Sequence, residues 1–311
     1  HGGNIYRDRV PAALFVINGF GKLVGSTQLR EPGELETPIL LTCTLCVWKA
    51  ADAMAAYLLA QSGMGTVRSI NPVVGETNDS YLNAIRGRPI SADDVVGALT
   101  GAHSGPVAEG SVGAGTGTST LGWKGGIGTS SRRVRMGDST WTVGVLVQTN
   151  FGGSGELILM GVPVGRLLGR DGVTGVEAPK GPTGSIMIVV ATDAPLSDRN
   201  LERLAARATI GLGRTGATAG NGSGDYVLAF STNAAVRRPA GAPMLPSTAL
   251  GNDVMNPLFA GVIEATEEAI DNALFAATTV TGNGHTVEAL PVGEVLRLLR
   301  ERNALAVPPR S

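Results

Sequence analysis

The feature that most constrains this chain is a buried strand that opens with a serine directly after a glycine. Residues 183–195 read Thr-Gly-Ser-Ile-Met-Ile-Val-Val-Ala-Thr-Asp-Ala-Pro. A continuous run of β-branched and apolar residues is typical of a strand that is covered on both faces. Cleavage of the Gly184-Ser185 bond would make Ser185 a new N-terminus, whose amine could activate its own hydroxyl as a nucleophile. The alternative is a plain turn before a core strand, which is what a Gly-Ser pair taken alone usually means.

The composition restricts the partners that this chain can have. A net charge of −1 offers no basic field for nucleic acid and no basic patch for a membrane surface. No apolar run approaches the length of about 18 residues that a membrane span needs. Charged residues make up 16% of the chain and apolar residues 43%, so we expect a compact protein in which subunit contacts replace part of the charged surface.

The two cysteines, Cys43 and Cys46, form a Cys-x-x-Cys pair. A zinc site needs a second pair of ligands, and a redox site needs a thioredoxin-like context. The histidines are scattered singly, and neither context is visible. We therefore expect reduced core cysteines, and neither a metal nor a cofactor.

The hydrophobic periodicity predicts alternating strands and helices in an α/β layered body with two sheets. Residues 75–79 are predicted to form a polar turn, and residues 165–183 an exposed segment that tolerates a chain break. The expected strands cover residues 13–18, 38–42, 70–74, 133–136, 142–150, 185–192 and 226–231. The expected helices cover residues 50–61, 92–101, 198–208, 258–276 and 291–299. Residues 110–128 are too rich in glycine for regular structure.

Several polar residues could serve a nucleophile without the help of a histidine. Asn150 ends a predicted strand, where its carboxamide can donate to a developing oxyanion. Ser223 and Asp225 flank Gly224 in a tight loop, and they can relay a proton or orient an amine. Glu109 precedes the glycine-rich segment and can pair with a substrate ammonium. Each signal alone is weak, since such residues are also common in ordinary turns and loops.

Seven sequence blocks, in one order along the chain, resemble the L-aminopeptidase/D-esterase and β-peptidyl aminopeptidase family, the self-processing serine peptidases of the DmpA/BapA type. The blocks are residues 18–22 (NGFGK), 34–39 (ELETPI), 71–79 (NPVVGETND), 108–110 with 113–117 (AEG and GAGTG), 124–132 (KGGIGTSSR), 184–185 with 191–196 (GS and ATDAPL), and 220–225 (GNGSGD).

The resemblance implies a four-layer α/β/β/α sandwich like that of N-terminal nucleophile hydrolases. It implies one peptidase domain over residues 1–311, cut between Gly184 and Ser185 into chains 1–184 and 185–311. Relatives carry several tens of residues before the position of His1, so we expect the family's first strand to be missing from this chain. The pieces are expected to stay together and to assemble into homo-oligomers, commonly tetramers.

The resemblance also assigns roles to individual residues. Ser185 is expected to be the nucleophile, and Asn150 the oxyanion donor. Ser223 and Asp225 match the serine and the acid beside the nucleophile, although some relatives have glutamate in place of the aspartate. Glu109 is expected to bind the free amine of a small peptide, amide or ester. Trp123 is expected to form a pocket wall.

The leading hypothesis is therefore a self-cleaving aminopeptidase or amidase that works through an acyl-enzyme on Ser185. One alternative is a catalytically silent or unprocessed relative that acts in binding or assembly. Another is an acyltransferase of the same fold, which usually cuts itself before threonine rather than serine. We expect a cytoplasmic location, with the periplasm as the alternative because the true N-terminus is not visible.

Overall fold

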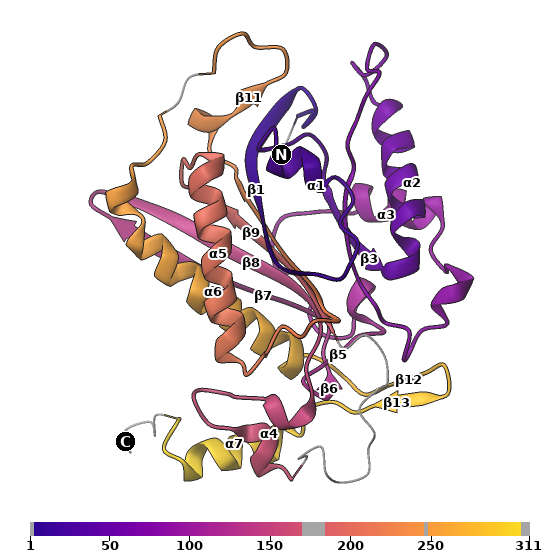
Figure 1. Cartoon of the computed structure of the whole chain (residues 1–311), viewed down its shortest axis with the longest axis vertical. Coiled ribbons are helices and arrows are strands. Elements are labelled where there is room, and N and C mark those ends of the chain that lie inside the picture. Colours follow the sequence, from indigo (N-terminus) through magenta and orange to yellow (C-terminus); the bar gives the residue numbers. More distant parts are fainter. Residues whose placement is uncertain (1–2, 170–183, 246–247, 306–311) are drawn as a thin grey trace.

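The computed structural model describes residues 3–169, 184–245 and 248–305. Within them the chain forms four layers, seen edge-on in Figure 1: a pair of long helices, a large sheet, a small sheet and a second pair of helices. This confirms the α/β/β/α architecture that the sequence resemblance implies.

The large sheet has seven strands in the order β11-β1-β10-β9-β8-β7, with β2 paired to β1. The central strand β9 begins at Ser185, as predicted. Its Ile186 and Ile188 belong to the core under the long helices, whereas Met187 belongs to the core under the small sheet. Both faces of β9 are therefore covered. The strands are β1 (Asp8–Gly19), β2 (Glu34–Leu35), β7 (Ile127–Met136), β8 (Ser139–Asn150), β9 (Ser185–Thr192), β10 (Gly224–Ser231) and β11 (Arg238–Pro239).

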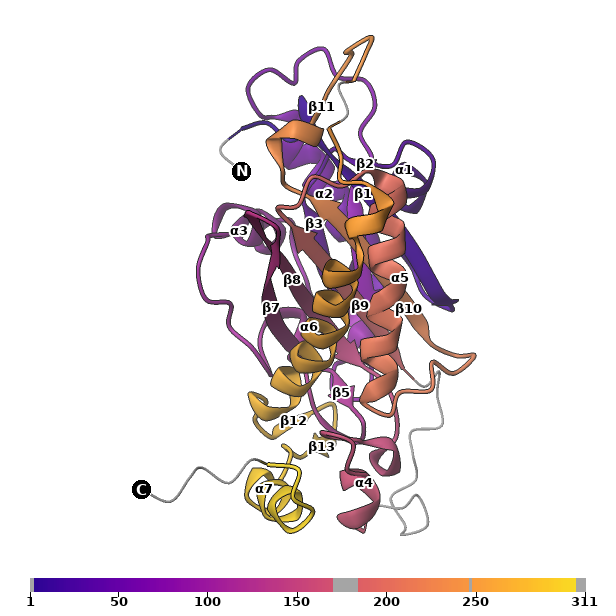
Figure 2. The ribbon, with the colours of Figure 1, turned by 90° about the vertical axis from the view of Figure 1, so that its left-hand side faces the viewer.

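Helices α5 (Asp198–Arg214) and α6 (Asn256–Phe275) cover one face of the large sheet, as Figure 2 shows from the helix side. The Ser197 hydroxyl caps α5 by accepting a hydrogen bond from the backbone N–H of Asn200. The stripe of Leu258, Val262 and Ala265 on α6 is wholly buried. Both helices thus form where the periodicity predicts them.

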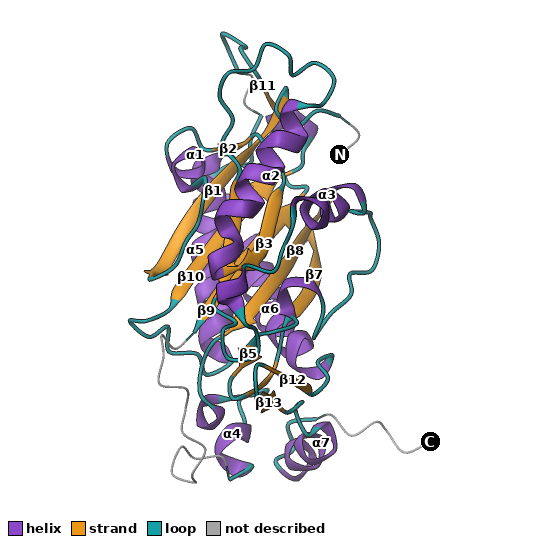
Figure 3. Ribbon diagram, turned by 90° about the vertical axis from the view of Figure 1, so that its right-hand side faces the viewer, coloured by secondary structure: helices purple, strands orange, loops and turns teal. Residues whose placement is uncertain are grey.

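The opposite face carries a parallel two-stranded sheet of β3 (Ile39–Cys43) and β4 (Val73–Thr77). Outside it lie α2 (Val47–Leu59) and α3 (Ala92–Thr100), with α2 in front of β3 in Figure 3. The predicted turn at residues 75–79 is wrong in its first half, because Gly75, Glu76 and Thr77 continue β4 and pair with β3. A buried second sheet accepts polar residues in a strand when neighbouring strands and loops supply their partners.

The remaining elements are short. They are α1 (Ser26–Arg30), β5 (Ser119–Thr120), β6 (Trp123–Lys124), α4 (Val164–Leu167), β12 (Val280–Gly282), β13 (His285–Val287) and α7 (Val292–Glu301), with 3-10 turns at η1 (Thr44–Cys46), η2 (Ile85–Gly87), η3 (Gly113–Gly115), η4 (Ser154–Glu156), η5 (Ala234–Val236) and η6 (Asn252–Val254). The segment expected to be irregular, residues 110–128, therefore contains the small β5–β6 hairpin. Most of the segment predicted to tolerate a chain break lies outside the described residues.

The cysteine prediction is wrong. Cys43 and Cys46 form a disulfide, because the 3-10 turn η1 brings their Cα atoms to 5.2 Å, a separation that a disulfide can span. A four-residue turn between a strand and a helix was not visible in the spacing alone.

None of the helices in the described ranges is both long and apolar enough to cross a lipid bilayer.

Candidate active site

A row of four residues crosses the large sheet at one end. Ser185, the first residue of β9, lies opposite Asn150 on the antiparallel strand β8 and opposite Gly224 on the parallel strand β10. Gly224 in turn lies opposite Gly19 on β1. The register of the strands therefore brings together residues that are separated by more than a hundred positions in the chain.

The Ser185 hydroxyl sits against the peptide bond that precedes it. Its Oγ donates a 2.6 Å hydrogen bond to the carbonyl oxygen of Gly184 and accepts one of 3.2 Å from the Gly224 N–H. Ser185 as a whole is 4% exposed. Gly184 has a φ of 110°, and a side-chain carbon there would lie 3.0 Å from Phe151 Cα, so only glycine fits easily.

Ser223 and Asp225 meet beside the nucleophile, as predicted. Asp225 Oδ1 accepts hydrogen bonds from the Ser223 hydroxyl at 2.5 Å and from the Ile186 N–H at 3.2 Å. Its Oδ2 is buried and has no hydrogen-bond partner among the described residues. Burial raises the pKa of Asp225, and the bonds from Ser223 and Ile186 oppose that rise. The carboxylate thus binds the N–H of the residue that follows Ser185, and its second oxygen has no partner within the described chain.

The carboxamide of Asn150 is fixed at both ends. Its Oδ1 accepts from the Ser119 N–H at 3.0 Å, and its Nδ2 donates to the Asn78 carbonyl at 2.9 Å. An amide nitrogen carries two hydrogens, so one of them is left for an oxyanion. Two bonds to different segments, strand β5 and the residue after β4, give this donor the rigidity that oxyanion stabilisation needs.

Glu76, on β4, was missed by the sequence reasoning and lies next to this row. A side-chain carbon added at Gly21 would lie 3.1 Å from Gly224 Cα and 3.2 Å from Glu76 Oε1, so the carboxylate and the strand that carries Gly224 are close neighbours. Glu76 is 2% exposed, and burial raises its pKa. Oε1 accepts from the Lys22 N–H at 2.9 Å and lies 3.7 Å from the half-exposed Lys22 ammonium. Oε2 makes no hydrogen bond of normal geometry within the described chain.

A signal for Glu76 was present in the sequence. Glu76 lies within residues 71–79 (NPVVGETND), one of the blocks that carry the family resemblance. A turn at Gly75-Glu76-Thr77 predicts a carboxylate exposed to solvent. A strand over the same residues predicts a buried carboxylate, as the structure has it.

Glu109 lies further along the sheet. Its Oε1 accepts from the backbone N–H and the hydroxyl of Thr129 at 2.7 and 2.6 Å. Thr129 pairs with Leu146, four residues before Asn150 on β8, which is about 13 Å along a strand. The hydrogen bonds of Glu109 thus tie it to Thr129 and not to the row around Ser185, and its amine-binding role stays a prediction.

Trp123 does not form an open pocket wall. Its side chain is 0% exposed and belongs to the main core with Leu121 and Leu157. A side chain without exposed surface cannot line a pocket in this conformation, so the expectation is corrected: Trp123 is a residue of the main core.

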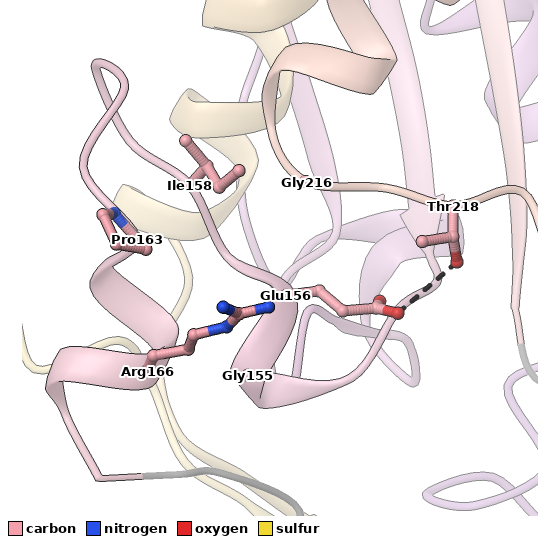
Figure 4. Close-up of a pocket in the computed structure, with 7 residues that line it drawn as sticks. All are labelled: Gly155, Glu156, Ile158, Pro163, Arg166, Gly216 and Thr218. Atoms are coloured by element: carbon pink, nitrogen blue, oxygen red, sulfur yellow. Dashed lines mark hydrogen bonds between the residues drawn. The ribbon is translucent and has the colours of Figure 1, made fainter.

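Two cavities lie elsewhere on the surface. One, of about 460 Å³, is lined by residues of η4, α4 and the loop after α5, including Glu156, Arg166 and Thr218 (Figure 4). The other, of about 490 Å³, is lined by Thr42, Cys43 and Asp79 among others. Neither has Ser185 in its lining. In the described ranges no group of three or more His, Cys, Asp or Glu side chains is arranged to hold a metal ion.

Comparisons with known proteins identify the family of this chain. Residues 1–287 match the model of peptidase family S58. The chain is 42% identical to the beta-peptidyl aminopeptidase BapA of Sphingosinicella xenopeptidilytica over 96% of this chain and 77% of that protein.

Two solved structures have the same fold. A beta-aminopeptidase from Burkholderia sp. superimposes with a TM-score of 0.89 at 39% identity, covering 99% of this chain and 85% of that one. The L-aminopeptidase D-Ala-esterase/amidase of Ochrobactrum anthropi, described as a serine aminopeptidase with a variant of the Ntn hydrolase fold, superimposes with a TM-score of 0.88 at 36% identity, covering 96% of this chain and 83% of that one. The chain therefore belongs to peptidase family S58 and is a serine peptidase.

Proposed function

We propose that this protein cuts its own chain between Gly184 and Ser185 and then works as an aminopeptidase through the new N-terminal serine. Its substrates would be small peptides, amides or esters with a free amine. The relatives named as aminopeptidases support the reaction class.

The observation that carries the proposal is the position of Ser185 Oγ in the uncut chain. It lies 2.6 Å from the carbonyl oxygen of Gly184, on a strand that Asn150 faces directly. An intramolecular nucleophile held beside its target gains a large effective concentration.

Self-cleavage then follows in two steps. Ser185 Oγ adds to the Gly184 carbonyl carbon, and its proton passes to the Ser185 nitrogen, so the C–N bond breaks and an ester forms. Water hydrolyses the ester and leaves a carboxylate on Gly184 and a free amine and hydroxyl on Ser185. The same hydroxyl, with the new amine as its base, can attack a substrate carbonyl and form an acyl-enzyme that water releases.

The substrate's ammonium needs an anionic partner near Ser185. Two carboxylates are candidates: Glu109, expected from the family resemblance, and Glu76, which the structure places beside Gly224. We favour Glu76 because it is buried and keeps an oxygen that makes no normal hydrogen bond. A buried charge-assisted hydrogen bond of this kind is worth about 1.5–3 kcal/mol.

The experiment compares an aminoacyl p-nitroanilide with its N-acetylated form on wild type, Glu76→Gln and Glu109→Gln. Wild type should cleave the free-amine substrate and nearly ignore the acetylated one. Glu76→Gln should reduce this preference about tenfold to a hundredfold, and Glu109→Gln should leave it unchanged. Equal hydrolysis of both substrates by wild type would overturn the aminopeptidase proposal, and the opposite ranking of the two variants would return the role to Glu109.

We also propose that the processed protein is a homo-oligomer. Three large apolar side chains are exposed on α2 or directly before it: Leu45, Trp48 and Leu59. A contact with a second subunit would remove this apolar surface from water. Size-exclusion chromatography with light scattering measures this directly, and a monomeric mass at working concentration would contradict it.

A further inference from the structure

The Cys43–Cys46 disulfide plays no part in the proposed hydrolysis, and its two sulfurs have different surroundings. Cys43 is 8% exposed and lines the cavity of about 490 Å³, whereas Cys46 is 0% exposed. A small thiol that enters this cavity therefore meets Cys43 and not Cys46.

The buried cysteine is placed as a good leaving group. Cys46 is the N-cap residue of α2, a helix of 13 residues. The positive end of a helix stabilises a thiolate, and a stabilised thiolate leaves a disulfide faster. The disulfide closes a ring of only four residues, so it restricts the unfolded chain much less than a long-range disulfide does.

The disulfide ring also lies against Glu76. Thr42 and Cys43 pair with Glu76 and Thr77 in the β3–β4 register. The next residue, Thr44, is inside the ring and 4% exposed. Its hydroxyl makes no hydrogen bond of normal geometry. Burial raises the pKa of Glu76, and the nearby Lys22 and Thr44 oppose that rise. Cys43 and Cys46 also pack with Ile85 and Ile90.

We propose that Cys43–Cys46 is a thiol–disulfide exchange site for small dithiols, and that its closed form holds Thr44 against Glu76 for recognition of the substrate amine. The second half of this proposal rests on the amine-binding role of Glu76 proposed above; the first half does not.

The exchange balances with a dithiol as the reductant. A thiolate of the dithiol attacks Cys43 Sγ, the Cys43–Cys46 bond breaks, and Cys46 leaves as a thiolate. The second thiol of the reagent attacks the mixed disulfide and releases Cys43. The protein gains two electrons and two protons, and the reagent becomes its cyclic disulfide.

Matched single variants test the exchange site. Folded Cys46→Ser keeps Cys43, and folded Cys43→Ser keeps Cys46. Each is incubated with glutathione disulfide and analysed by intact mass. Cys46→Ser should form the mixed disulfide readily, and Cys43→Ser only after denaturation. In wild type, dithiothreitol should add two hydrogens to the mass while the circular dichroism spectrum stays native. A disulfide that opens only in denaturant, or equal labelling of both variants, would overturn the exchange site.

Kinetics test the link to the substrate amine. Reduction should lower kcat/KM of wild type for the free-amine p-nitroanilide about twofold to tenfold, mainly through KM, as expected when one buried hydroxyl beside Glu76 is displaced. Reoxidation should restore it. The Cys43→Ser/Cys46→Ser double variant should behave like the reduced enzyme and ignore the reductant, while Thr44→Ala should show the lower kcat/KM with its disulfide intact.

If the fully reduced enzyme has unchanged kinetics, the disulfide does not affect recognition of the substrate amine. The proposal of an exchange site would still stand. If wild type does not prefer the free amine at all, the aminopeptidase proposal fails, and the labelling result still decides the exchange site.

Discussion

Asn150 and Ser185 face each other across neighbouring antiparallel strands, the last residue of β8 against the first of β9. Their positions follow from strand register and not from a flexible loop. If Ser185 is the nucleophile and Asn150 the oxyanion donor, as proposed, this ladder keeps their geometry when the Gly184–Ser185 bond is cut, and the same pair would serve both self-cleavage and peptide hydrolysis.

Removing the Asn150 donor should slow catalysis without unfolding the protein. Asn150→Asp keeps an acceptor for the Ser119 N–H and loses the donor, and Asn150→Ala loses both. Turnover of each should fall by roughly 10²–10³, the usual cost of one oxyanion donor. Asn272→Ala, which removes an amide bonded to the Thr129 carbonyl, is the matched control and should keep full activity. A loss below about threefold for both Asn150 variants would make Asn150 a structural residue only.

The Ser223–Asp225 pair should matter for proton transfer. Asp225→Asn keeps the shape of the side chain but removes the free carboxylate oxygen, so self-cleavage and turnover should both slow by roughly 10²–10⁴. Ser223→Ala should have a smaller effect of the same sign. Denaturing gels of samples quenched at successive times give the cleavage rate, and release of p-nitroaniline gives the turnover. Asp253→Asn, at an exposed position, is the control. If Asp225→Asn keeps the wild-type rates, the Asp225 carboxylate takes no part in proton transfer.

Lys124 should make stability depend on pH. Its side chain is 0% exposed, and Nζ donates to the carbonyls of Gly115 and Gly125 at 2.7 and 2.6 Å. Burial lowers its pKa from 10.5 to about 8, against the attraction of Asp79. Between these two values the unfolded chain binds a proton that the folded chain has released, so the free energy of unfolding should rise with pH in this window.

The comparison with Lys124→Met isolates this contribution. The difference in free energy of unfolding between wild type and variant should grow from about pH 8 to pH 10.5, by on the order of 3 kcal/mol at most. Urea titrations across this range measure it. A constant difference would mean that Lys124 keeps its charge when buried.

The large sheet could be predicted because its central strands are apolar and its helices have clear periodicity. Ser185 and Asn150 were placed at strand ends by the same patterns, and β8 and β9 end and begin there. Glu76 could not be recognised in this way, because a polar triplet in a strand resembles a turn until the loop carrying Gly21 and Lys22 is seen to cover it. The contacts that decide such a residue come from segments about fifty positions away.

The disulfide and Trp123 were mispredicted for a similar reason. Two cysteines three positions apart are compatible with a free pair or with a disulfide, and only the local turn decides between them. For Trp123, the family resemblance indicated its place in the sequence relative to the site but did not predict whether the side chain is buried. In the structure Trp123 lies in the β5–β6 hairpin, and its side chain belongs to the core.

Intact mass after expression tests the central claim most directly. If Ser185 is an N-terminal nucleophile, denatured wild type should give two masses, for residues 1–184 and 185–311, and Ser185→Ala should give only the uncut chain. In dilute solution the cut should proceed as a first-order reaction, because the attack is intramolecular. An uncut wild-type chain that still hydrolyses the free-amine substrate would contradict the account.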